Sequence, residues 1–297
     1  MKSTQEKVRD IIEEELGRAK IDAKWDMREI HVLPNSKCVI EHTSSTGTLS
    51  EALICHHFPQ IENEQEVAHY TSLDSFQNII KSGELWLFPI LKRIKEQEFR
   101  PFSEAHGLNG YLDQGSNCEP YYVSLMKDLY YTSFTSTNLA DEKYMWNVFG
   151  DGGTGVKIVF KISVIKKRAD FRPVLYHSKA KDSSTIIKKL SDRILNECDR
   201  HFILRGISRI GAFYLPLGFQ LEKEEETRLL VKSWGDGPAY DKIVYDKPYP
   251  YIPLEIGEGK NKFCKIIISE IHAGDKCDMT IVQESLQKSD FKSVPFY

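Results

Sequence analysis

The sequence predicts an α+β fold with a mixed or antiparallel β-sheet. Segments of strand character outnumber helical segments, and the two kinds do not follow the strict alternation that builds a parallel βαβ sheet. An apolar content of 41%, with 11% aromatic residues, is enough for a sizeable core in a chain of 297 residues. We expect residues 1–62 to form an N-terminal helical extension and residues 63–297 to form the main domain.

The extension begins with an amphipathic helix over residues 4–19. Charges of both signs cover its polar face, which favours docking against protein over binding to lipid. The apolar stripe consists of Val8, Ile11, Ile12 and Leu16. Residues 38–40 are typical of a short strand, and residues 49–55 fit either a helix or a strand.

A strand, a capped helix and a second strand are expected in close succession over residues 67–88. The β-rich run 67–71 leads into a helix that Ser72 or Asp74 can cap and that Gly83 ends. Apolar residues recur at helical spacing within it, namely Phe76, Ile79 and Ile80. His69 lies on the first strand, where it is a candidate for chemistry.

The middle of the chain contains two runs rich in aromatic and hydroxyl side chains, residues 121–124 and 130–136, and both have strand character. A helix over residues 140–149 follows, then a glycine cluster at residues 150–155 and a strand at 156–163. Phosphate-binding glycine loops precede a helix, whereas this cluster follows one. We therefore interpret the cluster as a turn between helix and strand.

The last third predicts a helix over residues 183–205 and an acidic segment, 221–226, that runs into a β-prone stretch. Strands are expected at 249–254 and 263–268, and a helix at 279–287. If the backbone is extended from Glu224 onward, then Glu224, Glu226 and Arg228 lie on one face of the strand. The cation can then keep the carboxylate of Glu226 ionised.

Charge and cysteine usage exclude several classes of protein. A formal net charge of −3 lacks the electrostatic footprint of a duplex-binding protein. Six scattered cysteines indicate reduced thiols, with no disulfide framework and no zinc site. The N-terminus lacks the apolar core of a secretion signal, and no run approaches the roughly 18 apolar residues of a membrane-spanning helix. We expect a cytoplasmic protein without a membrane partner.

Other candidate sites are weaker. Adjacent histidines on a strand point apart, so His56 and His57 do not predict a metal site. The chain has no nucleophile-elbow pattern for a hydrolase triad. A basic run can meet the phosphates of NAD or of a nucleic acid, although such a run is usually a solvated face. It consists of Lys157, Lys161, Lys166, Lys167 and Arg168.

Five motifs, taken in order, resemble the signature of a widespread, mainly bacterial domain-of-unknown-function family. They are His69-Tyr70-Thr71-Ser72, Ser82-Gly83-Glu84-Leu85-Trp86, Ser133-Phe134-Thr135, Met145-Trp146 with Gly155-Val156, and Glu224-x-Glu226-x-Arg228. That family is similar to the ADP-ribosyltransferase fold of diphtheria-toxin-like and poly-ADP-ribosyltransferase proteins, and some relatives occur in toxin and phage-defence settings. The resemblance covers about residues 65–290. Many relatives carry an Asn-Asp-Pro-x-Glu-like segment after the second strand, where this chain has residues 94–99 instead.

The resemblance implies a fold of split antiparallel or mixed sheets with flanking helices, NAD as the substrate, and no metal. Glu226 would be the catalytic carboxylate that stabilises positive charge on the nicotinamide ribose. Glu224 would contact the acceptor, and Arg228 would support the site. His69 would hydrogen-bond the adenosine ribose of NAD. The other expected cofactor-binding residues are Tyr70, Thr71, Phe134, Ser136 and Trp146, of which Phe134 and Trp146 would sandwich the nicotinamide.

Three functions remain open on this basis. The first is transfer of ADP-ribose from NAD to a protein or nucleic-acid acceptor. The second is NAD hydrolysis, in which water replaces the acceptor and the cofactor is depleted during a response to phage. The third is a catalytically silent module that binds a nucleotide or a protein. The sequence does not distinguish the acceptors and does not indicate an oligomeric state.

Overall fold

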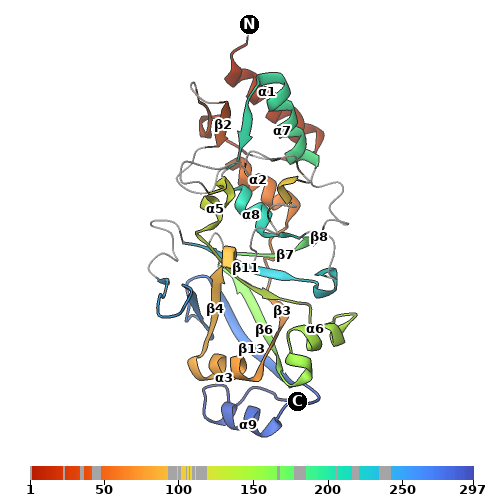
Figure 1. Cartoon of the computed structure of the whole chain (residues 1–297), viewed down its shortest axis with the longest axis vertical. Helices are drawn as coiled ribbons and strands as arrows, with labels where there is room; N and C mark the ends of the chain where they lie inside the picture. The colour runs from red at the N-terminus through yellow and green to blue at the C-terminus, as the bar shows by residue number, and fades with distance from the viewer. Residues whose placement is uncertain are drawn as a thin grey trace. The chain divides into compact units, whose positions relative to one another are not determined.

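The computed structural model forms two compact units (Figure 1). Unit 1 consists of Met1–Pro59, Arg93–Lys127 and Leu175–Leu217, and unit 2 of Gln60–Lys92, Asp128–Val174 and Gly218–Tyr297. The structure describes residues 2–22, 24–33, 37–41, 48–92, 99, 102–104, 106, 108, 111, 119–165, 168–176, 185–204, 206–215, 221–233 and 242–297. The predicted boundary near residue 62 lies close to the first of these divisions. The sequence did not indicate that residues 93–127 and 175–217 belong with the N-terminal part.

In its described residues, unit 1 is mainly helical and has two small sheets. Its helices are α1 (Thr4–Arg18), α2 (Thr48–His57), α5 (Tyr121–Met126), α7 (Thr185–Cys198) and α8 (Ile207–Ala212). One sheet has the order β1-β2-β9, from Ile30–Val32, Cys38–Glu41 and His201–Ile203, and the other pairs β10 (Tyr214–Leu215) with β8 (Leu175–Tyr176). Helix α1 packs against α7, where Arg193 of α7 donates to Glu15 of α1 at 2.9 Å.

Unit 2 contains two antiparallel sheets. The larger has the order β12-β4-β5-β11-β7, from Ile252–Glu255, Glu84–Pro89, Leu129–Phe134, Thr227–Lys232 and Asp170–Pro173. The smaller has the order β13-β6-β3, from Cys264–Ala273, Val156–Val164 and Gln65–Thr71. The helices are α3 (Leu73–Ser82), α6 (Glu142–Val148) and α9 (Met279–Gln287). The α+β class predicted from the sequence is therefore observed.

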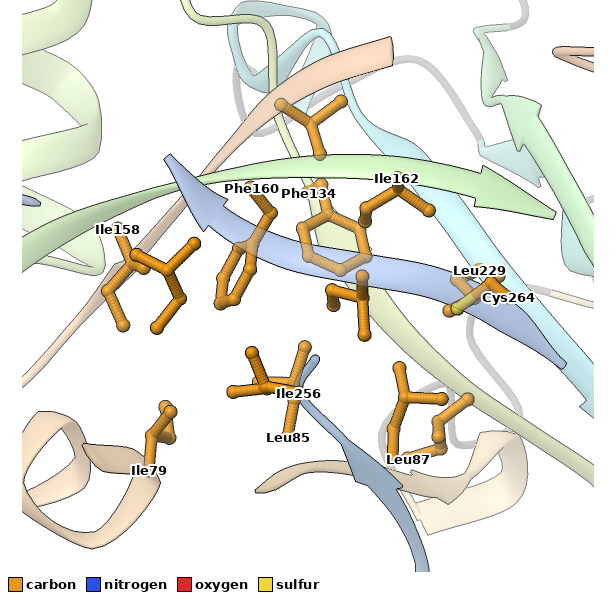
Figure 2. Close-up of a cluster of buried hydrophobic side chains, with 14 of the residues drawn as sticks. Ile79, Leu85, Leu87, Phe134, Ile158, Phe160, Ile162, Leu229, Ile256 and Cys264 are labelled. Atoms are coloured by element: carbon orange, nitrogen blue, oxygen red, sulfur yellow. The ribbon is translucent and has the colours of Figure 1, made fainter. Parts of the chain in front are cut away.

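The two sheets of unit 2 share one apolar core and also meet through the backbone. Figure 2 shows side chains from both sheets and from α3 converging on the core. Ile158 and Phe160 come from the smaller sheet, and Leu87 and Leu229 from the larger one. Each fully buried large apolar side chain stabilises the fold by about 1.5–3 kcal/mol. Beside the core, the backbones of Ala68 and Thr135 exchange two hydrogen bonds of 2.8 and 2.9 Å, which join β3 to the end of β5.

Several local predictions are confirmed. Ser72 caps α3 by accepting from the backbone N–H of Ser75, and Gly83 ends the helix at φ +69°. Helix α9 spans the predicted residues, and the segment 49–55 lies within α2. The strand predicted at 121–124 is wrong, because this segment belongs to α5. Its buried side chains, Tyr122 and Met126, are four residues apart, which is the spacing of a helix face.

The glycine cluster forms the predicted turn between α6 and β6, and its glycines are needed for close backbone contact. A Cβ on Gly155 would lie 2.2 Å from the carbonyl oxygen of Thr71, and one on Gly274 would lie 2.1 Å from that of Gly153. Gly274 donates to the Gly155 carbonyl at 3.0 Å, and Lys276 donates to the Gly153 carbonyl at 3.0 Å. A side chain at Gly155 would push this turn away from the end of β3, and a side chain at Gly274 would push the loop that contains it away from the turn.

None of the helices in the described part of the chain is long and apolar enough to cross a membrane.

His57, the last residue of α2, is a buried histidine. Its side chain is 8% exposed, and within the described residues neither ring nitrogen has a partner. Burial, followed by the neighbouring His56 and His106, lowers the pKa of His57 from its ordinary value of 6.5 to about 3. The folded protein therefore keeps this ring neutral at pH values where the unfolded chain protonates it.

We predict that acid destabilises the protein through His57. Below about pH 6.5 the unfolded state binds a proton that the folded state does not, so the free energy of unfolding falls by about 1.4 kcal/mol per pH unit. His57→Phe should flatten this dependence in urea unfolding measured between about pH 5 and 8. His201→Phe, which alters an exposed histidine of the same unit, is the control. Parallel curves for wild type and His57→Phe would contradict the prediction.

Candidate functional site

The candidate site is built around a buried ion pair at the start of β11. The Arg228 guanidinium donates from Nε to Oε1 of Glu226 at 2.7 Å and from Nη2 to Oε2 at 3.1 Å. The two residues are separated by one position, so both side chains lie on the same side of the strand. Glu226 is 5% exposed and Arg228 is 2% exposed. The two-point contact fixes the orientation of the carboxylate.

A second arginine lies next to Arg228 in the sheet. Arg172 of β7 is the direct cross-strand partner of Arg228, and it donates to Asp170 at 3.0 and 3.2 Å. Like charges directly opposite each other destabilise a sheet. Each of these guanidinium groups contacts a carboxylate two residues earlier on its own strand, which offsets that repulsion.

Ser133 connects Glu226 to His69. It is the cross-strand partner of Arg228 on β5, and its hydroxyl donates to Oε1 of Glu226. Its backbone carbonyl accepts a hydrogen bond from Nδ1 of His69 at 3.0 Å, so this nitrogen carries the proton. One serine thus links the carboxylate of the larger sheet to the histidine of the smaller sheet.

Glu224 is not on the strand face that the extended-backbone prediction gave it, and that prediction is wrong. Residues Leu221–Glu224 form a short 3₁₀ turn, Glu225 has φ +43°, and β11 begins at Thr227. Glu225 has a left-handed backbone conformation, which interrupts the extended chain. The alternation that places Glu226 and Arg228 on one face therefore does not extend back to Glu224. Glu224 instead accepts from the hydroxyl of Tyr144 at 3.4 Å.

Tyr70 and Trp146 form a second group, between β3 and α6. Their ring centroids are 4.9 Å apart and nearly perpendicular. The Tyr70 hydroxyl and the Lys157 ammonium each donate to Oε1 of Glu142 at 2.7 Å. Burial, followed by the Glu142 carboxylate, raises the pKa of Tyr70. Burial raises the pKa of Glu142, but the hydrogen bonds from Lys157 and Tyr70 outweigh it, and the pKa is lowered overall.

The predicted aromatic pair, Phe134 and Trp146, is split between two clusters. Phe134 is 3% exposed and belongs to the main core, where its neighbours include the rings of His69, Phe160 and Phe171. Trp146 packs in the cluster of Ala68, Tyr70 and Met145. Successive residues of β3 face opposite sides, so His69 adjoins Phe134 while Tyr70 adjoins Trp146.

The other predicted residues, Thr71, Ser136 and the basic run, contact neighbouring parts of the protein where the structure describes them. Thr71 is buried at the end of β3, where its carbonyl is approached by Gly155. The hydroxyl of Ser136 accepts from the backbone N–H of Asn138 at 3.2 Å. In the basic run, Lys161 pairs with Glu66 at 3.3 Å, and Lys166 and Lys167 lie outside the described residues. Most of residues 94–99 also lie outside them.

The sequence predicts no individual role for Ser133, Glu142 or Tyr144, and it indicates Lys157 only as a member of the basic run. Ser133 was visible as part of the Ser133-Phe134-Thr135 motif, but its link to Glu226 depends on the register of β5 against β11. Glu142 carries no sequence signal, because its partners are 72 and 15 residues away along the chain. Across the described residues, no group of three or more His, Cys, Asp or Glu side chains could hold a metal ion.

No family model, curated protein or solved structure matches this chain.

We predict that Glu226 and Arg228 are energetically coupled. Glu226→Gln or Arg228→Gln leaves one buried charge without its partner and should cost about 3–5 kcal/mol of unfolding free energy. The double variant leaves neither charge alone and should lose clearly less than the sum of the two single losses. Urea unfolding of the four proteins measures the coupling.

The matched control for this cycle is Glu222→Gln, an exposed glutamate of the preceding turn, which should change stability by less than about 0.5 kcal/mol. Strictly additive losses in the double variant would refute the coupling.

Proposed function

We propose that unit 2 is an ADP-ribosyltransferase-like domain that transfers ADP-ribose from NAD, with Glu226 as its catalytic carboxylate. The observation that carries the proposal is the position of Glu226. Its carboxylate is oriented by Arg228 and Ser133 beside the place where two antiparallel sheets are joined, and Ser133 links it to His69. The motif resemblance independently selects the same glutamate and the same histidine.

The chemistry needs a fixed negative charge. When the bond between nicotinamide and ribose breaks, its electron pair leaves with nicotinamide, and positive charge develops on the ribose. A preorganised carboxylate stabilises that charge without having to reorient. The acceptor then forms a bond to the same ribose carbon and loses its proton. Glu226 suits this role because Arg228 holds both of its oxygens.

His69 and Trp146 are the proposed NAD-binding side chains. The Ser133 carbonyl fixes the His69 ring through Nδ1, which positions the ring for the adenosine ribose. Trp146 is half-buried, so part of its ring can pack against a ligand. Phe134 lies within the core, and we assign it a supporting role beneath His69 instead of a place in an aromatic sandwich.

A silent binding module is the second candidate, and one observation favours it. Glu226 is almost completely buried, and both of its oxygens already accept hydrogen bonds. A carboxylate satisfied in this way can serve purely as a structural partner of Arg228. NAD hydrolysis is the third candidate and differs from transfer in the acceptor, which is then water.

We predict that purified protein releases nicotinamide from NAD and that Glu226→Gln lowers this release by roughly 100-fold or more, because the charge on the ribose loses its counter-charge. Glu222→Gln is the matched control and should retain activity. Dependence on added cell lysate would indicate transfer, and release without lysate would indicate hydrolysis.

Folding and binding must be measured beside activity, because Glu226→Gln removes the carboxylate charge that Arg228 contacts. The melting temperature of the variant shows whether loss of activity follows from unfolding. A rise in the melting temperature of wild type with NAD, without any release of nicotinamide, would support the silent module. The NAD proposal would be refuted if wild type released no nicotinamide and NAD did not raise its melting temperature.

A further inference from the structure

A cluster of aromatic and lysine side chains lies at the β12-β4 edge of the larger sheet, outside the candidate site. We call it the aromatic–lysine surface. It consists of Trp86, Phe88, Lys92, Lys247, Tyr249 and Tyr251. Leu85 and Leu87 of β4 belong to the core, so the alternation of the strand places Trp86 and Phe88 on the opposite face.

The rings of this surface are already arranged next to one another. Trp86 and Tyr251 have centroids 4.4 Å apart with planes tilted by 31°, and Phe88 lies 6.5 Å from Tyr251. Tyr249 is 49% exposed, whereas Tyr251 is buried at 6%. The partly exposed rings of Trp86, Phe88 and Tyr249 offer flat surfaces on which a ligand can stack.

Lysine ammonium groups lie over these rings. Lys92 Nζ is 4.4 Å from the centroid of Phe88 and 3.9 Å from that of Tyr249, and Lys247 Nζ is 5.8 Å from that of Trp86. Two acidic residues also contact the surface: Glu84 accepts from the Trp86 indole at 3.3 Å, and Asp246 hydrogen-bonds the Tyr251 side chain. The acids therefore bind the polar atoms of the rings, while the cations lie at their faces.

We propose that the aromatic–lysine surface binds single-stranded nucleic acid. Unpaired bases stack on aromatic rings, and ammonium groups bind the phosphates between them. Both kinds of group alternate here over a few residues. A duplex hides the faces of its bases and depends on dense positive charge, which a chain of net charge −3 does not supply.

The surface and the candidate site are related through Tyr131, which is itself 3% exposed. Phe88 is the cross-strand partner of Tyr131, and the guanidinium carbon of Arg228 lies 5.0 Å from the centroid of the Tyr131 ring. Directly paired residues in a sheet point to the same side, so the surface and the Arg228–Glu226 pair share one face of the larger sheet. If the proposed transfer function holds, single-stranded nucleic acid is the acceptor class that this geometry favours.

The test is fluorescence anisotropy with a labelled short oligothymidylate, the corresponding oligouridylate, and a duplex of the same length. Wild type should bind the single strands more tightly than the duplex. Tyr249→Ala should weaken single-strand binding roughly 5- to 100-fold. Lys247→Ala should reduce the slope of log affinity against log salt by about 0.7. Tyr249 and Lys247 are both exposed, so the variants should fold normally.

Matched controls are Tyr121→Ala, an exposed tyrosine of unit 1, and Lys288→Ala, an exposed lysine after α9. Glu226→Gln separates the two proposals, because it should abolish nicotinamide release without weakening oligonucleotide binding. The inference would be overturned if wild type failed to bind single strands or bound the duplex equally well. It would also be overturned if wild type bound a proline-rich peptide instead of single strands. Each of these outcomes holds whatever the NAD assay shows.

Discussion

The pairing of Glu226 with Arg228 is the constraint on which the proposed site depends. Arg228 is almost fully buried and lies directly opposite Arg172, so it needs a carboxylate within hydrogen-bond distance. Glu226 meets that need and in doing so is fixed beside Ser133. The contact with Glu226 offsets the cost of burying the Arg228 charge in the larger sheet. It also holds a negative charge in one orientation, which is what stabilisation of a developing positive charge requires.

Much of unit 2 could be predicted because its signals are local. The cap at Ser72, the left-handed Gly83 and the apolar spacing of α3 all lie within a dozen residues and agree with one another. The division of the chain could not be predicted, because unit 1 is assembled from three separate segments. The aromatic content of residues 121–124 favours a strand, whereas the burial of Tyr122 and Met126 on one helix face determines the structure.

The positions of the site residues could be predicted where strand alternation determines which side chains share a face. They could not be predicted where the backbone departs from an extended strand. Glu226 and Arg228 share a face as expected, but the positive φ of Glu225 separates Glu224 from them. The resemblance pairs Phe134 with Trp146. In the structure, Phe134 contacts His69 and Trp146 contacts Tyr70, and these two neighbouring residues of β3 face opposite sides of the smaller sheet. Such relations depend on the register between distant strands, which a single sequence does not contain.

The contact between the 150–155 turn and the 274–276 loop has a mechanical consequence. Backbone touches backbone there, with glycines on both sides and hydrogen bonds from Gly274 and Lys276. Most of these contacts join backbone atoms, which cannot change rotamer to absorb a displacement; the Lys276 ammonium adds a side-chain contact by donating to the Gly152 carbonyl at 3.1 Å. A movement of α6, which carries Trp146 and Glu142, should therefore be passed on to the start of α9 as a rigid shift. Ligand binding at α6 would then be detectable as altered hydrogen exchange in a helix far along the sequence.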